Sequence, residues 1–278
     1  MRNVGDIITK VKFDVDGDYR HRNIPLMSPR VLESSLQVVM RKVLIGAGLF
    51  LLFGGAVHAE GPTLEKNVTE AVGRLSAFDQ SLSFQERKAL RQTSKNGGGR
   101  FSGALLKKYE EREGLKQRVE DARLMVDLKR RLLDLPGHED FSSGALNVRR
   151  VQEAETVART IVPAFADLRR QYEMVRPAIF HNLLVNMGIK DQGLCWHWAR
   201  DLTDRLRDLD LKTFDLIWAT ARGETMREHN TVVVVSRGHG LEDGLLLDGW
   251  KKAGKPFWIR VPDDKKHPWK VGQYYGGR

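Results

Sequence analysis

The spacing of apolar residues changes once along the chain, and this change restricts the fold to few classes. Between residues 62 and 187, apolar side chains recur every three or four positions, which predicts helices. The clearest stripes run from Val68 to Leu82 and from Val157 to Val175. From Gly188 onward, glycines, tryptophans and short β-rich runs replace the stripes. The sequence therefore predicts an α+β fold, in which a helical N-terminal half precedes a smaller part built around a sheet.

Local signals divide these two parts into elements. Ser83 and Glu86 form a capping-box pattern, which predicts that a second helix begins there. A long charged helix is expected from Ser102 to Leu135, where Pro136 and Gly137 follow it; a coiled-coil arm is the alternative for this segment. In the second part, a helix that starts near Cys195 precedes four β-rich runs. These runs predict a small antiparallel sheet and cover residues 214–220, 231–236, 245–247 and 256–261.

One strongly apolar run, Val43–Val57, lies near the start of the chain. It follows the basic pair Arg41-Lys42 and is followed by the small residue Ala59, an order typical of a secretory signal peptide. As a helix, the run would extend only ~23 Å, less than the ~30 Å of a hydrocarbon core. We therefore expect a signal peptide over residues 40–59, cleaved after Ala59. The mature chain would then have no stable membrane span and would be periplasmic or secreted.

The segment before this run is too long and too acidic to be the start of a signal peptide. We interpret Met40 as the true start of the protein and residues 1–39 as an upstream extension. The alternative is a short cytoplasmic tail before an uncleaved anchor. After the signal peptide, we expect a helical region over residues 60–187 and a second region over residues 188–278. The helical region would be a prodomain, a cap or a docking arm.

Charge and cysteine content exclude several classes of protein. The chain has a net charge of +10 and a single cysteine. One cysteine rules out internal disulfides and four-cysteine zinc sites. The basic pairs, such as Lys107-Lys108 and Arg130-Arg131, are spread along the expected helices, which favours solvated helix faces over a nucleic-acid groove. We expect no nucleic-acid partner, and attraction to anionic wall polymers or lipid head groups stays open.

The single cysteine lies where a glycine-containing loop leads into an amphipathic helix. At a helix N-terminus, the helix dipole and the free N–H groups favour the thiolate of Cys195. The same N–H groups can stabilise an oxyanion. This position predicts a nucleophile rather than an inert thiol. Gln192 and Trp196, which flank Cys195, are the candidates for contacts with substrate or oxyanion.

A thiol nucleophile requires a base and a group that orients the base. His197 is two positions after Cys195 and points to another side of the helix, so it is a poor base. His229 opens a strand, Asp248 ends a leucine run, and the midpoint between them falls in the turn Arg237–Gly240. We expect a hairpin that places His229 and Asp248 directly opposite each other on adjacent strands. Asp248 would then hold the imidazole while His229 faces Cys195.

Several neighbouring residues have weaker predicted roles. Trp196, Trp198 and Trp250 are interpreted as core aromatics, and Trp250 shares the strand parity of Asp248, so it would shield the triad from water. Asn182 and Asn186 precede the nucleophile loop and would cap or line the site. Three further histidines have no matching partners in the sequence, and we interpret them as surface or core residues: His181, His239 and His267.

The residues Gly193-Leu194-Cys195-Trp196-His197-Trp198-Ala199 resemble the nucleophile motif of transglutaminase-like proteins, within the wider papain-like group of cysteine hydrolases. The resemblance covers roughly residues 188–261. It implies a core in which the nucleophile helix packs on a small antiparallel sheet. It also implies that Cys195 is the nucleophile, His229 the general base and acid, and Asp248 the orienting residue. The sequence departs from the family after His229, where Asn230 and Thr231 stand instead of an aromatic residue.

These observations predict an exported thiol hydrolase or acyltransferase that acts on amide bonds, peptide or isopeptide, through an acyl-enzyme on Cys195. No cofactor is expected, and the partner would be a protein or peptide substrate, for example in the cell envelope. The alternative is a non-catalytic envelope binding or scaffold protein with a transglutaminase-like fold. A zinc site made by Cys195, His229 and Asp248 is disfavoured, because their spacing matches no zinc motif.

Overall fold

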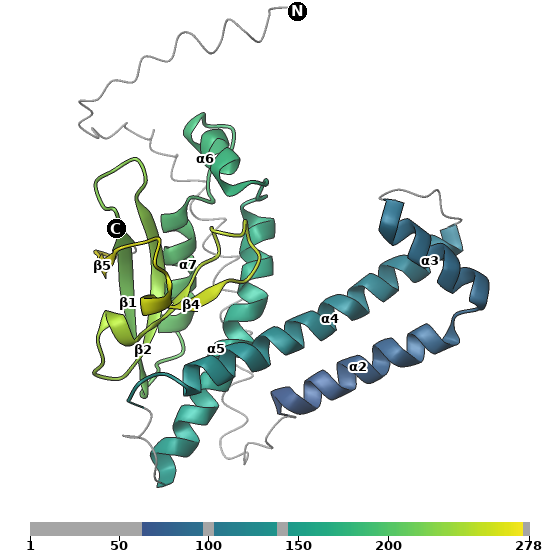
Figure 1. Cartoon of the computed structure of the whole chain (residues 1–278), viewed down its shortest axis with the longest axis horizontal. Coiled ribbons are helices and arrows are strands. Elements are labelled where there is room, and N and C mark those ends of the chain that lie inside the picture. Colours follow the sequence, from purple (N-terminus) through teal and green to yellow (C-terminus); the bar gives the residue numbers. More distant parts are fainter. Residues whose placement is uncertain (1–62, 97–102, 138–143, 275–278) are drawn as a thin grey trace, which may run out of the picture. The chain divides into compact units, whose positions relative to one another are not determined.

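The computed structural model describes residues 63–96, 103–137 and 144–274 (Figure 1). The expected extension 1–39 and signal peptide 40–59 lie outside these described residues. Within them, no helix is long and apolar enough to cross a membrane. The described chain contains helices and a small antiparallel sheet, which confirms the predicted α+β class.

The helices follow the apolar stripes closely. The predicted capping box at the start of α3 is confirmed, because the Ser83 N–H donates to Glu86 Oε2 at 2.8 Å and the Glu86 N–H donates to Ser83 Oγ at 3.3 Å. The long charged helix ends two residues earlier than expected, and Pro163 lies inside α5. The helices are α2 (Leu64–Ser81), α3 (Phe84–Asn96), α4 (Gly103–Leu133), α5 (Gly144–Gln171), α6 (Ala178–Asn186) and α7 (Cys195–Arg207).

Helices α2, α3 and α4 form an arm. Helix α2 packs along α4, and α4 packs along α5. Across the arm, the Arg112 guanidinium makes two hydrogen bonds to the Asp79 carboxylate, of 2.6 and 2.9 Å. Lys108 of α4 donates to Glu86 of α3 at 2.6 Å. These charged pairs therefore connect α2 and α3 to α4.

The sheet is antiparallel throughout, with the strand order β4-β3-β2-β1-β5. Its strands are β1 (Phe214–Ala221), β2 (His229–Ser236), β3 (Leu245–Leu247), β4 (Trp258–Arg260) and β5 (Trp269–Val271). Helix α7 lies along the sheet and packs on β2 and β1 (Figure 1). The expected helix-on-sheet core is therefore present. Strand β5 was not predicted, because three residues are too few to establish a period-2 pattern.

One apolar core joins the helices to the sheet. Leu128 of α4, Phe165 of α5, Leu202 of α7 and Val232 of β2 belong to the same buried cluster. The opposite face of the sheet has a smaller cluster that includes Val233. The change at Gly188 thus marks a change of secondary structure inside one compact unit, Pro62–Arg278.

A buried arginine strengthens this junction. Arg150 of α5 is only 2% exposed. Its Nη2 donates to the Leu132 carbonyl at 3.1 Å and to Ser236 Oγ at 3.0 Å. Its guanidinium carbon lies 4.6 Å from the centre of the Phe214 ring. One side chain therefore connects α5 to α4 and to two strands of the sheet.

Candidate active site

Cys195 is the first residue of α7, as the sequence predicts. Gly193 has φ of +112°, a conformation that favours glycine, and it turns the chain into the helix. The Leu194 N–H donates to His197 Nδ1 at 3.2 Å, so the side chain of His197 helps to fix the start of the helix. The Cys195 thiol is directed to the Glu228 carbonyl, with a sulfur–oxygen distance of 3.8 Å. The nucleophile candidate thus lies beside the residue that precedes β2.

His229 and Asp248 form a buried pair. His229 Nε2 lies 2.8 Å from Asp248 Oδ2, and both residues are only 4% exposed. The other carboxylate oxygen, Oδ1, accepts a hydrogen bond from the Lys251 N–H at 2.9 Å. The Asp248 carboxylate is therefore held from two sides, and it fixes the orientation of the imidazole.

The register of the two strands differs from the prediction. In the sheet, Val232 pairs with Leu247, and continuing this register by one residue places Asp248 beside Thr231. The expectation that His229 and Asp248 lie directly opposite each other is therefore wrong by two residues. Because side chains alternate between faces with a period of two, a shift of two keeps both side chains on one face. The pair is diagonal, and the imidazole bridges the extra distance.

One imidazole nitrogen of His229 has no hydrogen-bond partner. His229 Nδ1 is buried and forms no hydrogen bond within the described residues. Burial lowers the pKa of His229. Hydrogen bonding to Asp248, the nearby Cys195 thiol and the charges of both groups outweigh burial and raise this pKa to about 9. Asp248 therefore holds Nε2, and Cys195 is close enough to influence the imidazole.

Aromatic side chains surround the imidazole. The Trp250 ring centre lies 4.9 Å from that of His229, where it limits access of water to the imidazole. The Trp250 indole N–H donates to Asn182 Oδ1 of α6 at 2.8 Å. The predicted neighbours Trp250 and Asn182 are thus both close to the site, with Asn182 acting through the indole.

A second row of side chains, which the sequence did not reveal, lies on the other side of His229. The register places His229, Ala221 and Trp269 side by side on three neighbouring strands. Because Ala221 is small, the rings of His229 and Trp269 approach to 5.4 Å between centres. The His267 ring is also 5.4 Å from His229, and its Nδ1 lies 2.9 Å from Asp264 Oδ2. The i, i+3 spacing of Asp264 and His267 was the only sequence signal for this pair.

The nucleophile helix and the acid are brought together by close packing at Gly249. A Cβ at this position would lie only 2.1 Å from the Trp198 ring. Trp198 is 1% exposed, as expected of a core aromatic, and it belongs to α7 three residues after Cys195. Gly249 is therefore required so that the chain after Asp248 can pass beneath α7.

The two weaker candidates, Gln192 and Trp196, make contacts outside the triad. Gln192 Oε1 accepts a hydrogen bond from Gln171 at 3.4 Å, and its carbonyl oxygen lies 2.8 Å from Nε2 of His181. The Trp196 ring stacks on His197, with 3.7 Å between ring centres. Within the described residues, these contacts of Gln192 and Trp196 do not involve the Cys195 thiol.

His197 has a structural part in the site. Burial, followed by the positive charge of Arg200, lowers its pKa to about 4. A neutral imidazole fits its contact, because Nδ1 must accept the Leu194 N–H. His197 therefore caps α7 as a neutral side chain, and His229 is the histidine that interacts with Cys195.

The described chain gives no further support to a zinc site. Across residues 63–96, 103–137 and 144–274, no group of three or more histidine, cysteine, aspartate or glutamate side chains is placed to hold a metal ion. In the triad, Asp248 and Cys195 both interact with the imidazole of His229 instead of converging on a common point.

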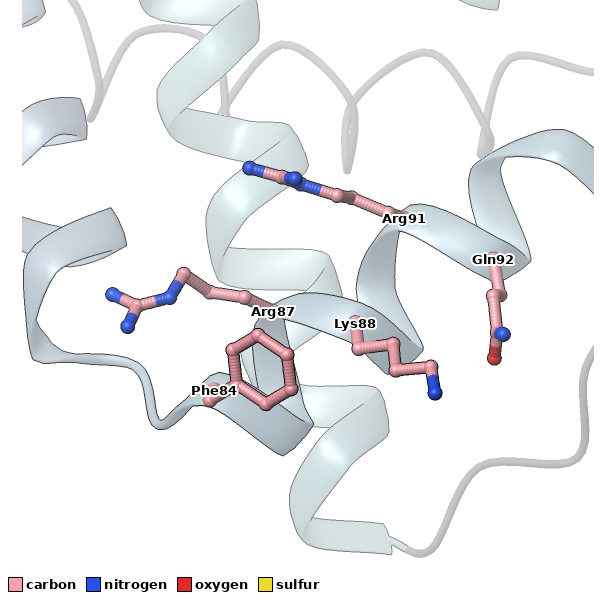
Figure 2. Close-up of a pocket in the computed structure, with 5 residues that line it drawn as sticks. All are labelled: Phe84, Arg87, Lys88, Arg91 and Gln92. Atoms are coloured by element: carbon pink, nitrogen blue, oxygen red, sulfur yellow. The ribbon is translucent and has the colours of Figure 1, made fainter.

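Two cavities differ in their relation to the triad. Figure 2 shows one of about 300 Å³ on α3, lined by Phe84, Arg87, Lys88, Arg91 and Gln92. Its lining comes from one helix of the arm, whereas the triad comes from α7, β2 and the chain after β3. A second cavity, of about 470 Å³, lies between the β1–β2 connection and β5. Glu228 lines it, and the Glu228 carbonyl contacts the Cys195 thiol. This second cavity therefore adjoins the site.

No protein-family model, no curated protein and no solved structure matches this chain.

Proposed function

We propose that this protein is an exported thiol hydrolase or acyltransferase, similar to transglutaminase-like enzymes, that acts on peptide or isopeptide bonds. The observation that carries the proposal is the buried His229–Asp248 contact of 2.8 Å, which leaves the other imidazole nitrogen, Nδ1, without a hydrogen bond in the described residues. A base oriented by a carboxylate and adjacent to a thiol is the arrangement that nucleophilic catalysis requires.

The reaction begins with transfer of the Cys195 thiol proton to His229 Nδ1. The sulfur then attacks the carbonyl carbon of the amide, and a tetrahedral oxyanion forms. The first backbone N–H groups of α7 have no partner within the helix, so they can donate to this oxyanion. His229 gives its proton to the leaving amine, the C–N bond breaks, and an acyl-enzyme thioester remains on Cys195.

The second half of the reaction regenerates the thiol. His229 takes a proton from water, and the hydroxide attacks the thioester carbonyl. The C–S bond breaks, the carboxylic acid leaves, and the sulfur recovers a proton from His229. An amine in place of water gives a new amide. Hydrolysis is favoured, because water is the abundant acceptor outside the cell.

The cavity beside Glu228 is the proposed entry for the substrate. It has room for side chains on one side of the scissile bond, and Arg222, Glu228 and Lys270 line it. Mixed charge and a wall of exposed strand residues suit a polypeptide better than an apolar small molecule. We propose a protein or peptide of the cell envelope as substrate and a periplasmic or secreted location.

A non-catalytic scaffold is the second candidate, and burial of the triad favours it. Cys195 is 9% exposed, and His229 and Asp248 are 4% exposed. A site so covered admits a substrate only if a neighbouring side chain moves. Under this alternative, Cys195 is an inert thiol and the helical arm binds an envelope partner.

Capture of the acyl-enzyme tests the proposal. The purified protein is incubated with a peptide extract of the cell envelope, quenched in acid and measured by intact mass spectrometry. We expect an adduct that maps to Cys195, is released by hydroxylamine and is absent from Cys195→Ala. A chain that acquires no adduct and leaves the peptides uncleaved would favour the scaffold.

A further inference from the structure

Helix α6 contacts the site through two adjacent residues. His181 is 0% exposed and faces the loop before Cys195, while Asn182 reaches Trp250 above His229. These two contacts belong to opposite sides of the site, the nucleophile side and the base side. No partner for His181 was predictable from the sequence, and in the structure each ring nitrogen has one.

His181 holds the backbone of the nucleophile loop. Its Nδ1 accepts the Val175 N–H at 3.2 Å, which leaves Nε2–H to donate to the Gln192 carbonyl at 2.8 Å. The loop is also packed directly on the ring, because a Cβ at Gly193 would lie 2.2 Å from His181 Nε2. Both contacts lie within three residues of Cys195, so the imidazole of His181 fixes the position and direction of the first turn of α7.

Asn182 contacts Trp250, the side chain that covers His229. Its Oδ1 accepts the Trp250 indole N–H at 2.8 Å, and the Trp250 ring centre lies 4.9 Å from that of His229. The charged or titratable groups around His229 are Asp248, Cys195, His267 with Asp264, and Lys251, which joins Asp248 to Asp264. Trp250 packs against the apolar core, and the hydrogen bond to Asn182 fixes the direction of its indole N–H.

We propose that α6 positions the site from both sides. His181 sets the nucleophile loop, and Asn182 sets Trp250 against His229, so both are positioning residues of a site that neither touches with a reacting atom. This inference rests on the proposed thiol chemistry. It goes further by assigning to one short helix the alignment of the thiol with the base.

The rate of Cys195 alkylation by iodoacetamide, measured from pH 5 to pH 10, tests the inference. His181→Leu removes both ring contacts and is expected to lower the rate at pH 6, where activation of the thiol is largest, about tenfold. His181→Gln keeps a donor for the Gln192 carbonyl and is expected to recover the rate to within about threefold. A role in stability alone would give two slow variants or two normal ones, in proportion to their unfolding temperatures.

The positioning role of Asn182 is tested by a double-mutant cycle. Asn182→Leu and Trp250→Phe each break the same hydrogen bond, and both are expected to move the rate profile by about one pH unit as water reaches His229. The double variant should match either single one, because the bond is already lost. The matched control is Leu183→Ala, at an exposed position of the same helix, and it should behave as the wild type.

The outcomes separate this inference from the proposed function. If wild-type Cys195 is activated and all α6 variants react as the wild type does, the positioning role is overturned and the proposed function stands. Additive effects of Asn182→Leu and Trp250→Phe would overturn the Asn182 part. If wild-type Cys195 reacts no faster at pH 6 than a free thiol, the proposed function itself fails, and the inference fails with it.

Discussion

The side chains of His229, the first residue of β2, and Asp248, which directly follows β3, meet at 2.8 Å in a buried contact, although the two residues are two positions out of register. The contact uses Nε2 of the imidazole, and Nδ1 forms no hydrogen bond within the described residues. In the mechanism that we propose, Nδ1 takes the proton of the Cys195 thiol, and Asp248 stabilises the resulting imidazolium.

Asp248→Asn tests the charge in this contact. The amide can still accept the Nε2–H, but it carries no charge, so the pKa of His229 should fall. We expect the rate of the acyl transfer to drop about 10²–10⁴-fold, the range for loss of acid–base function. Cys195→Ala and His229→Ala should abolish turnover. The measurement is the rate of acyl-enzyme formation at neutral pH.

Asp243→Asn is the matched control for this prediction. Asp243 also pairs with a histidine, since its Oδ2 lies 3.1 Å from His239 Nδ1. That pair lies in the connection between β2 and β3, and the wild-type rate should be retained. Equal losses in the two variants would mean that the effect is general destabilisation.

Stability should depend on pH in opposite directions through two histidines. The pKa of His229 is about 9 in the folded chain and about 6.5 when unfolded, so its stabilisation is complete below pH 6.5 and is lost as the pH rises through 9. The pKa of His197 is about 4, so stability is lost as the pH falls from 6.5 through 4. Each shift is equivalent to about 3 kcal/mol, and urea unfolding should show a maximum near pH 6.5.

Single variants show which histidine causes the loss of stability on each side of the maximum: the acidic limb below pH 6.5 and the alkaline limb above it. His229→Gln should flatten the alkaline limb, and His197→Gln should flatten the acidic limb above the range where carboxylates titrate. His239→Gln should leave both limbs unchanged. A free energy of unfolding that stays constant from pH 6.5 to pH 9 in the wild type would contradict the raised pKa of His229.

Arg150 should be the arginine on which the fold depends most. Arg150→Leu removes donors from the Leu132 carbonyl and from Ser236 Oγ inside the core. We expect a loss of about 1–3 kcal/mol in the free energy of unfolding, because buried acceptors are left without a donor. The neighbouring Arg149 is exposed, and Arg149→Leu should change stability by less than about 0.5 kcal/mol. Chemical denaturation of the two variants gives the comparison.

The secondary structure of this chain was largely predictable, because each long helix carries an apolar stripe or a capping pattern. The pair Ser83 and Glu86 predicts the start of α3, and both capping hydrogen bonds are present. Strand β5 was missed, since a strand of three residues has too few positions to show a period. The helical and sheet parts share a core through Arg150 and Phe165, a contact that depends on tertiary packing and has no local signal.

The candidate site was predictable in residue type but not in register. The midpoint of a hairpin gives the parity of His229 and Asp248, and parity was sufficient to put them on one face. It cannot give the exact partner, because the connection from Arg237 to Gly244 includes a 3₁₀ turn at Leu241–Asp243 that changes its length. His181 could not be assigned from sequence at all, since its partners are backbone groups.

The pH dependence of Cys195 alkylation, in the wild type and in His229→Gln, tests the central claim most directly. A thiol paired with an imidazolium should react with iodoacetamide at a nearly constant rate from pH 6 to pH 8, about tenfold faster at pH 6 than a free thiol. His229→Gln should abolish that plateau. A wild-type rate that rises only near pH 8.5, as for a free thiol, and is unchanged by His229→Gln would contradict the account.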